Sequence, residues 1–258
     1  MRPTSAIPIV EAMDHRLRLT VFAVVACICA ALLAVRNSHK RSSDASRVVI
    51  HTLRFGSSEY RYYVFTPAPT QTSKPLPLLF LVHGIGGNGL HFLRLWQDFA
   101  RQNQIVLLAP TLPVQGGLEK DVADLFPSFV EDAKKRCGNI DPRRIYLFGY
   151  SVGGYSAFDA ATLDSNYFAA AAVLAGVITP DYDWILEKAQ RKTPVAMYMG
   201  DRDRRFSLAQ AERTRNVLVA HGFPVRYVEI AQQYHYYGEK LAWVQQDSWN
   251  FMREYKLP

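Results

Sequence analysis

The feature that most constrains this chain is a regular alternation of short apolar runs with longer amphipathic segments from residue 48 onward. Two strand-like runs, Val48–Phe55 and Tyr60–Thr66, come first, and six strand–helix alternations follow. The run LPLLFLV at Leu76–Val82 is apolar throughout, as expected for a strand buried on both faces. This pattern predicts an α/β fold with a mostly parallel eight-stranded sheet and helices on both of its faces.

One domain, residues 48–258, accounts for all of these elements. The further strands are expected at residues 105–109, 145–150, 169–174, 194–199 and 225–230. Helices are expected at residues 90–102, 125–136, from 152, near 183–190, and at 208–221 and 239–254.

Residues 1–35 are expected to form an N-terminal signal or membrane-anchor segment, and residues 36–47 a polar linker. Leu19–Val35 is a run of 17 residues without a charge, and basic residues flank it on both sides. A cleaved signal peptide, a retained anchor and lipidation at Cys27 all remain open. Each of them predicts an extracytoplasmic protein, periplasmic or extracellular, that is either held at a membrane or released from it.

The charge and cysteine content exclude several classes of protein. The chain carries a net charge of +7, but residues 48–258 hold 23 basic and 20 acidic residues, which is too balanced for a nucleic-acid-binding face. Three cysteines without a CxxC pattern or a Cys/His cluster do not form a disulfide framework or a structural zinc site. We therefore expect no nucleic-acid partner and no metal, and the sequence indicates no oligomeric state.

The motif G-x-S-x-G occurs as GYSVG at residues 149–153. The apolar strand IYLFG leads into Ser151 and a helical segment starts directly after it, which is the context of a nucleophile elbow. Such an elbow holds the serine on a strained turn so that its hydroxyl projects beyond the sheet. We therefore predict that Ser151 is a nucleophile.

A serine nucleophile needs a general base and an acid that orients the base. His235 follows the last predicted strand by a short loop, and so it should lie at the same carboxyl edge of the sheet as Ser151. Asp203 and Asp201 both follow the strand at 194–199, and Asp203 is favoured. The more remote candidates, after the preceding strand, are Asp181 and Asp183.

The loop HGIGG at residues 83–87 follows the third predicted strand and should supply part of an oxyanion hole. We assign its two donors to the main-chain N–H groups of Ile85 and Val152, and we expect His83 to play a structural role. The same loop contains G-x-G-x-x-G, a dinucleotide fingerprint. That fingerprint requires an acidic residue at the end of the next strand, where the sequence reads Leu108-Ala109-Pro110, so no nucleotide cofactor is expected.

With GYSVG, HGIGG, the aspartate after GDR and His235, residues 48–258 resemble the α/β-hydrolase superfamily. Within it they look like the polyhydroxybutyrate-depolymerase, feruloyl-esterase and dienelactone-hydrolase-like serine esterases. The resemblance implies a catalytic triad of Ser151, Asp203 and His235. It departs from these esterases in one place, because they often have a glycine before the histidine whereas this chain has Gln233-Tyr234.

The sequence therefore predicts a serine esterase that acts without metal or cofactor on small esters or on the end of a polyester. A peptidase on the same scaffold is the second enzymatic interpretation. A catalytically silent, membrane-tethered binding module is a third, although such a module has no need of nucleophile, base and acid together.

Overall fold

The structure is a computed structural model that describes residues 47–68, 74–113, 124–236 and 238–258. The predicted leader at residues 1–35 and the linker as far as residue 46 lie outside the described residues. Within the described ranges, no helix combines the length and the apolar character that a membrane span requires.

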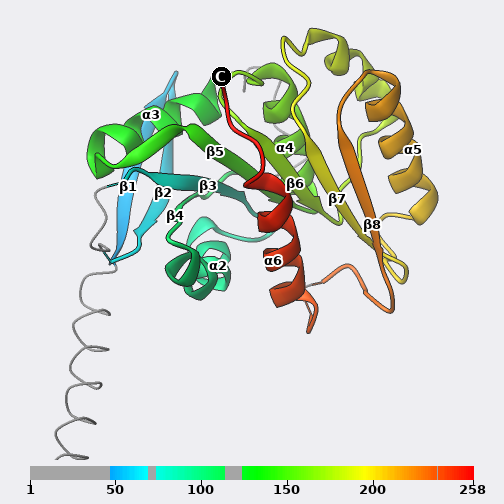
Figure 1. Cartoon of the computed structure of the whole chain (residues 1–258), viewed down its shortest axis with the longest axis horizontal. Coiled ribbons are helices and arrows are strands. Elements are labelled where there is room, and N and C mark those ends of the chain that lie inside the picture. The colour runs from blue at the N-terminus through cyan, green and yellow to red at the C-terminus, as the bar shows by residue number, and fades with distance from the viewer. Residues whose placement is uncertain (1–46, 69–73, 114–123, 237) are drawn as a thin grey trace, which may run out of the picture. The chain divides into compact units, whose positions relative to one another are not determined.

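The described residues form the predicted succession of strands and helices (Figure 1). The strands are β1 (Arg47–Phe55), β2 (Ser58–Thr66), β3 (Leu76–Val82), β4 (Val106–Pro110), β5 (Ile140–Tyr150), β6 (Ala170–Leu174), β7 (Val195–Gly200) and β8 (Val225–Ile230). The helices are α2 (Gly89–Asn103), α3 (Leu125–Cys137), α4 (Val152–Leu163), α5 (Leu208–Ala220) and α6 (Leu241–Met252), together with the 3-10 helix η2 (Pro180–Lys188).

The predicted eight-stranded, mostly parallel sheet is confirmed. Its strand order is β1-β2-β4-β3-β5-β6-β7-β8. Strand β2 runs antiparallel to both of its neighbours, β1 and β4, and all neighbouring pairs from β4 to β8 are parallel. The chain runs from β3 outward to β4 and then returns to the other side of β3 for β5, so the order reverses at this point. In open α/β sheets, ligands bind beyond the carboxyl ends of the strands at such a switch point.

Helices cover both faces of the sheet and divide the core into two layers. Phe80 on β3 stacks on Phe126 of α3 at 4.6 Å between ring centroids, in the layer that also holds buried residues of α4 and α5. On the other face, Phe148 of β5 packs against Trp96 of α2, in the layer that holds α6. Figure 1 shows α6 in front of the strands and α4 behind them. The alternation of side chains along each strand therefore fills both layers.

Two elements differ from the sequence-based expectation. The helix expected near 183–190 is the 3-10 helix Pro180–Lys188. Its well-buried residues Ile185 and Leu186 are adjacent, so they do not form the stripe with a spacing of three and four that favours an α-helix. Strand β5 also starts five residues early, at Ile140. Its pairing with β3 shifts register between Leu76 and Leu78, opposite a segment containing Pro142, whose missing N–H interrupts the ladder.

Candidate active site

Ser151 lies on a strained turn between β5 and α4. Its φ is 55° and its ψ is −121°, a region that non-glycine residues rarely adopt. Its N–H donates to the carbonyl of Leu174 at the end of β6, at 2.9 Å, and its carbonyl accepts the N–H of Gly154 at 2.8 Å. The surrounding strands and helix thus hold the turn, as the nucleophile-elbow motif predicts.

The second motif glycine permits a close approach between α4 and β3. A Cβ atom added at Gly153 would lie 2.4 Å from the carbonyl oxygen of Val82 and 2.5 Å from that of His83. Side-chain carbons essentially never approach backbone oxygens so closely. Only glycine therefore allows α4 to begin directly beside the end of β3, which brings Ser151 next to the loop that follows this strand.

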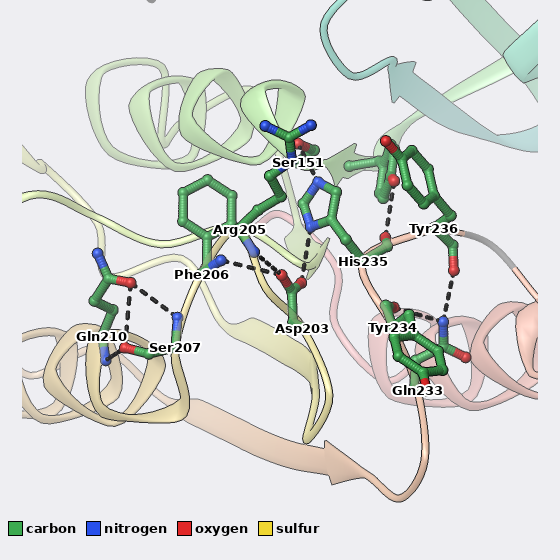
Figure 2. A network of polar contacts seen from close by, with 11 residues as sticks. Ser151, Asp203, Arg205, Phe206, Ser207, Gln210, Gln233, Tyr234, His235 and Tyr236 are labelled. Carbon is green, nitrogen blue, oxygen red and sulfur yellow. Dashed lines mark hydrogen bonds and ion pairs between the residues drawn. The ribbon is translucent and has the colours of Figure 1, made fainter.

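Ser151, His235 and Asp203 lie in one chain of hydrogen bonds, drawn in Figure 2. The Oγ atom of Ser151 is 2.9 Å from Nε2 of His235, and Nδ1 of His235 is 2.8 Å from an oxygen of Asp203. These three residues follow β5, β8 and β7 respectively, so the parallel sheet delivers them to the same edge. The arrangement allows the imidazole to accept the serine proton while the carboxylate orients it.

The carboxylate of Asp203 is completely buried and has partners on both oxygens. One oxygen contacts His235, and the other accepts the main-chain N–H groups of Arg205 and Phe206 at 2.7 and 3.0 Å. Several hydrogen bonds compensate the cost of burying this group. They also fix its orientation toward the imidazole, of which only 11% is exposed.

The other aspartates considered as the acid do not contact His235. Asp201 is an exposed turn residue whose N–H donates to the carbonyl of Ile230 at 3.1 Å. Asp183 forms an ion pair with Arg213, and Asp181 is exposed on the 3-10 helix η2. Of the four candidates, Asp203 is the one whose carboxylate the structure brings to the imidazole.

The loop after β3 lies directly against the serine. A Cβ atom at Gly84 would lie 3.3 Å from Cβ of Ser151. Ile85 follows in a turn closed by a hydrogen bond of 3.1 Å from the N–H of Gly87 to the carbonyl of Gly84, and its side chain is 65% exposed. Val152 is the first residue of α4, where main-chain N–H groups point away from the helix. Assignment of the Ile85 and Val152 N–H groups to an oxyanion hole remains a prediction.

His83 is buried at the base of the same loop and holds two segments together. Its Nδ1 is 2.8 Å from the carbonyl of Gly84, and its Nε2 accepts the N–H of Leu112 at 3.1 Å. Nδ1 therefore carries the proton, because a carbonyl oxygen only accepts. Burial lowers the pKa of His83, which favours this neutral form. Both ring nitrogens are occupied, so His83 serves the loop rather than the serine.

Residues that the motifs did not single out also surround the imidazole. The ring of Phe206 lies 5.7 Å from that of His235, and the ring of Tyr236 lies 5.8 Å from it on another side. Tyr150, the residue before Ser151, places its ring 5.5 Å from His235. The position of Tyr150 inside GYSVG was the one sequence signal that could have drawn attention to it.

The described residues contain no group of three or more His, Cys, Asp or Glu side chains that could hold a metal ion. In the dinucleotide-like motif, Gly84 and Gly86 lie between β3 and α2, and Gly89 is the first residue of α2. Two of these glycines are tightly packed against other parts of the chain. A Cβ atom at Gly84 would lie 2.9 Å from the ring of Tyr150, and a Cβ atom at Gly89 would lie 2.3 Å from the carbonyl oxygen of Ala109. Packing therefore accounts for Gly84 and Gly89, whereas Gly86 has a φ of 71°, which favours glycine.

Comparison with known proteins gives a family match over most of the folded region. Residues 79–255 match the alpha/beta hydrolase family. A stretch of 154 residues is 30% identical to the bifunctional acetylxylan esterase/xylanase XynS20E of Neocallimastix patriciarum. This alignment covers 56% of the present chain but only 22% of that protein, so the chain spans about a fifth of its relative's length.

Two solved structures show the same fold. A thermostable esterase superposes with a TM-score of 0.63 at 20% identity, over 83% of this chain and 63% of the other, which is less than two thirds of it. A ferulic acid esterase superposes with a TM-score of 0.65 at 17% identity, over 81% of this chain and 97% of the other. At sequence identities of 20% and 17%, this similarity shows a shared fold and nothing about the activity of the present chain.

Proposed function

The chain belongs to the alpha/beta hydrolase family, and from that membership we propose that it is a serine hydrolase of carboxylic esters that works through an acyl-enzyme. The observation that carries the proposal is the continuous path of two hydrogen bonds from Ser151 through His235 to Asp203. The strained φ of Ser151 and the full burial of the Asp203 carboxylate support it. Backbone strain of this kind costs free energy and clusters at active sites, and a buried carboxylate that orients the histidine is the arrangement of a catalytic triad.

In the proposed first step, Oγ of Ser151 attacks the ester carbonyl carbon while Nε2 of His235 takes its proton. The hydrogen bond from Nδ1 to Asp203 keeps Nε2 free of a proton before the attack and stabilises the imidazolium that forms. His235 then donates the proton to the departing alcohol oxygen, and the acyl group stays on Ser151. Water activated by His235 releases the acid in the reverse sequence, so no cofactor is needed.

The oxyanion of each tetrahedral intermediate is proposed to accept the main-chain N–H groups of Ile85 and Val152. The closeness of Gly84 to Ser151 supports this assignment, because it brings the turn containing Ile85 beside the nucleophile. The start of α4 adds the positive end of a helix dipole. Loss of one such donor typically raises the barrier by about 3–4 kcal/mol.

The proposed substrates are small esters or the accessible end of a polyester. Two apolar side chains next to the site, Ile85 and Tyr236, are 65% and 68% exposed, which favours an open entrance with apolar walls. The name of the Neocallimastix relative makes acetylated xylan a further ester to test. A panel of esters with different acyl lengths, including hydroxyacid oligomers, feruloyl esters and acetylated xylan, would rank these classes by kcat/KM.

We also propose an extracytoplasmic location, attached to or released from a membrane through the apolar run at 19–35. This proposal rests on the sequence of that run and its basic flanks. Expression of the full chain, followed by cell fractionation and mass spectrometry of the mature N-terminus, separates a cleaved signal, a lipidated Cys27 and a retained anchor. Recovery of the intact chain in the cytoplasmic fraction would contradict the proposed location.

The central experiment is covalent labelling by a fluorophosphonate, which reacts with an activated serine. Wild type should be labelled, whereas Ser151→Ala should not be labelled and should lose about 10⁵–10⁶-fold in kcat. Ser156→Ala is the matched control, since it removes another buried hydroxyl from the following turn of α4. That control should be labelled like wild type. Labelling that persists in Ser151→Ala would exclude Ser151 as the nucleophile.

The same preparation distinguishes esterase from peptidase activity. Hydrolysis of p-nitrophenyl esters without hydrolysis of aminoacyl p-nitroanilides supports the ester assignment. The opposite preference would indicate a peptidase, and a wild-type protein that is neither labelled nor active on any acyl substrate would indicate a binding module.

A further inference from the structure

The loop that carries His235 receives little support from main-chain hydrogen bonds. Between β8 and α6, the described main-chain bonds join Gln233 to Ile230, Arg202 to Gln233, Leu241 to Gly238 and Val244 to Lys240. Within the described residues, the carbonyls of positions 234, 235 and 236 accept no main-chain N–H. An irregular loop of this kind does not by itself hold an imidazole in a fixed place.

Two side chains occupy all three of these carbonyls. The hydroxyl of Tyr150 donates to the carbonyl of His235 at 2.8 Å. Nε2 of Gln233 donates to the carbonyls of Tyr234 and Tyr236 at 2.7 and 2.6 Å, as Figure 2 shows. A primary amide nitrogen has two hydrogens and its oxygen has none, so two carbonyl partners fix which end of the amide faces the loop. These side-chain hydrogen bonds therefore hold the main chain at His235 and at both of its neighbours in sequence.

Tyr150 also connects the base to the nucleophile through a single residue. Its backbone is bonded to Ser151, and its hydroxyl reaches His235, which lies 85 positions further along the chain. The ring is 8% exposed and packs in the core layer beneath the site. Burial raises the pKa of Tyr150 to about 12, so the hydroxyl keeps its proton at neutral pH.

We propose that Tyr150 and Gln233 are positioning residues that set the distance and orientation of the His235 imidazole relative to Oγ of Ser151. The inference rests on the proposed function, because it assigns His235 the role of base. It also gives Gln233, which lies two residues before the histidine, a defined role in this loop. Neither residue is proposed to touch the substrate.

A control variant separates a positioning role of Tyr150 from a purely structural one. It removes a comparable buried tyrosine hydroxyl on the same strand. Tyr146 lies four residues before Tyr150 on the same face of β5. Its hydroxyl donates to the main-chain carbonyl of Tyr255 at 2.9 Å, and burial raises its pKa to about 12 as well. Tyr146→Phe therefore removes an equivalent buried hydrogen bond that does not involve the His235 loop.

The test compares Tyr150→Phe, Gln233→Met, the double variant and Tyr146→Phe in the full chain. It measures kcat and KM on p-nitrophenyl acetate, the rate of fluorophosphonate labelling, and Tm. Tyr150→Phe and Gln233→Met should each lower kcat and the labelling rate by about threefold to tenfold, with KM unchanged. The double variant should lose more than either single variant. Tyr146→Phe should lower Tm and leave kcat and the labelling rate at wild-type values.

Wild-type kcat and labelling rates in both single variants would overturn the inference, and so would an equal loss in Tyr146→Phe. If Tyr150→Phe does not fold, Gln233→Met decides the matter, because its side chain lies in a surface loop rather than in the core. Failure of wild type to react with the fluorophosphonate would instead refute the proposed function itself, so the two failures are distinct.

Discussion

The carboxylate of Asp203 holds the imidazole of His235 at 2.8 Å with one oxygen, while its other oxygen is anchored by two main-chain N–H groups. The two oxygens therefore have different tasks. One determines which ring nitrogen of His235 carries the proton, and the other keeps the side chain in place. A substitution that keeps the two main-chain hydrogen bonds but replaces the oxygen facing His235 therefore separates the two roles of Asp203.

Asp203→Asn should abolish most of the activity while preserving the fold. The amide oxygen can keep the two main-chain hydrogen bonds, so the amide nitrogen then faces Nδ1 of His235. An N–H donor there forces the proton of the neutral imidazole onto Nε2, which can no longer accept the proton of Ser151. We expect kcat to fall by about 10⁴-fold with Tm close to wild type. Steady-state kinetics and thermal unfolding measure both quantities.

The control is Asp201→Asn, an exposed neighbour in the same turn region that does not contact the imidazole. Its kcat should equal that of wild type. An equal loss in both variants, or retained activity in Asp203→Asn, would contradict the assignment of Asp203.

Gly153→Ala should destabilise the protein. The added methyl would lie 2.4 and 2.5 Å from two carbonyl oxygens of the segment ending β3, and main-chain atoms there cannot move without disturbing the sheet. Overpacking of this kind typically costs about 1–3 kcal/mol, and we expect the upper end of that range or more. Denaturant unfolding gives the change in free energy, and loss of fluorophosphonate labelling should accompany it.

Ser156→Ala on the same helix should behave oppositely. Its hydroxyl is buried and has no hydrogen-bond partner among the described residues. Removing an unsatisfied buried polar group is expected to leave stability unchanged or to raise it by up to about 1 kcal/mol. A Gly153→Ala variant as stable as Ser156→Ala would show that α4 does not need its close approach to β3.

Asp159→Asn should stabilise the protein in a pH-dependent way. Burial on α4 raises the pKa of Asp159 from 3.8 to about 7 in the folded state. Between these two values the folded state binds a proton that the unfolded chain releases, so wild-type stability falls as the pH rises from about 4 to 7. Asparagine does not titrate. The advantage of the variant should therefore grow through this range and then level off.

Thermal unfolding at about pH 4, 6 and 8 checks this prediction, with roughly 2–4 °C in Tm for each kcal/mol recovered. Asp201→Asn, which removes an exposed carboxylate, should show no comparable trend. An advantage of Asp159→Asn that is constant with pH, or that shrinks as the pH rises, would refute a raised pKa for Asp159.

Much of the site could be predicted because the sheet is parallel. Each strand's carboxyl end can be found from local hydrophobic patterns, and parallel strands place those ends at one edge. Residues that follow β5, β7 and β8 could therefore be grouped before their distances were known. The strained turn at Ser151 was likewise predicted from glycines within two residues of it.

The sequence pattern could not distinguish two candidate residues that follow the same strand. Asp201 and Asp203 both follow β7, and only the folded turn points one of them at His235 while the other faces solvent. The sequence also did not predict that η2 is a 3-10 helix. Its buried residues Ile185 and Leu186 join the core layer that contains α4 and do not follow a helical repeat in the sequence.

By itself, then, the amino-acid sequence determined the strands, the turn at Ser151 and the edge of the sheet at which Ser151, Asp203 and His235 gather, because these depend on periodicities and turn residues spanning a few positions. Only the tertiary structure decided which aspartate contacts the imidazole of His235. It also decided that the side chains of Tyr150 and Gln233 donate hydrogen bonds to the carbonyls of the His235 loop. Hydrogen bonds between such distant positions depend on directions in space, and those directions exist only once helices and strands have packed.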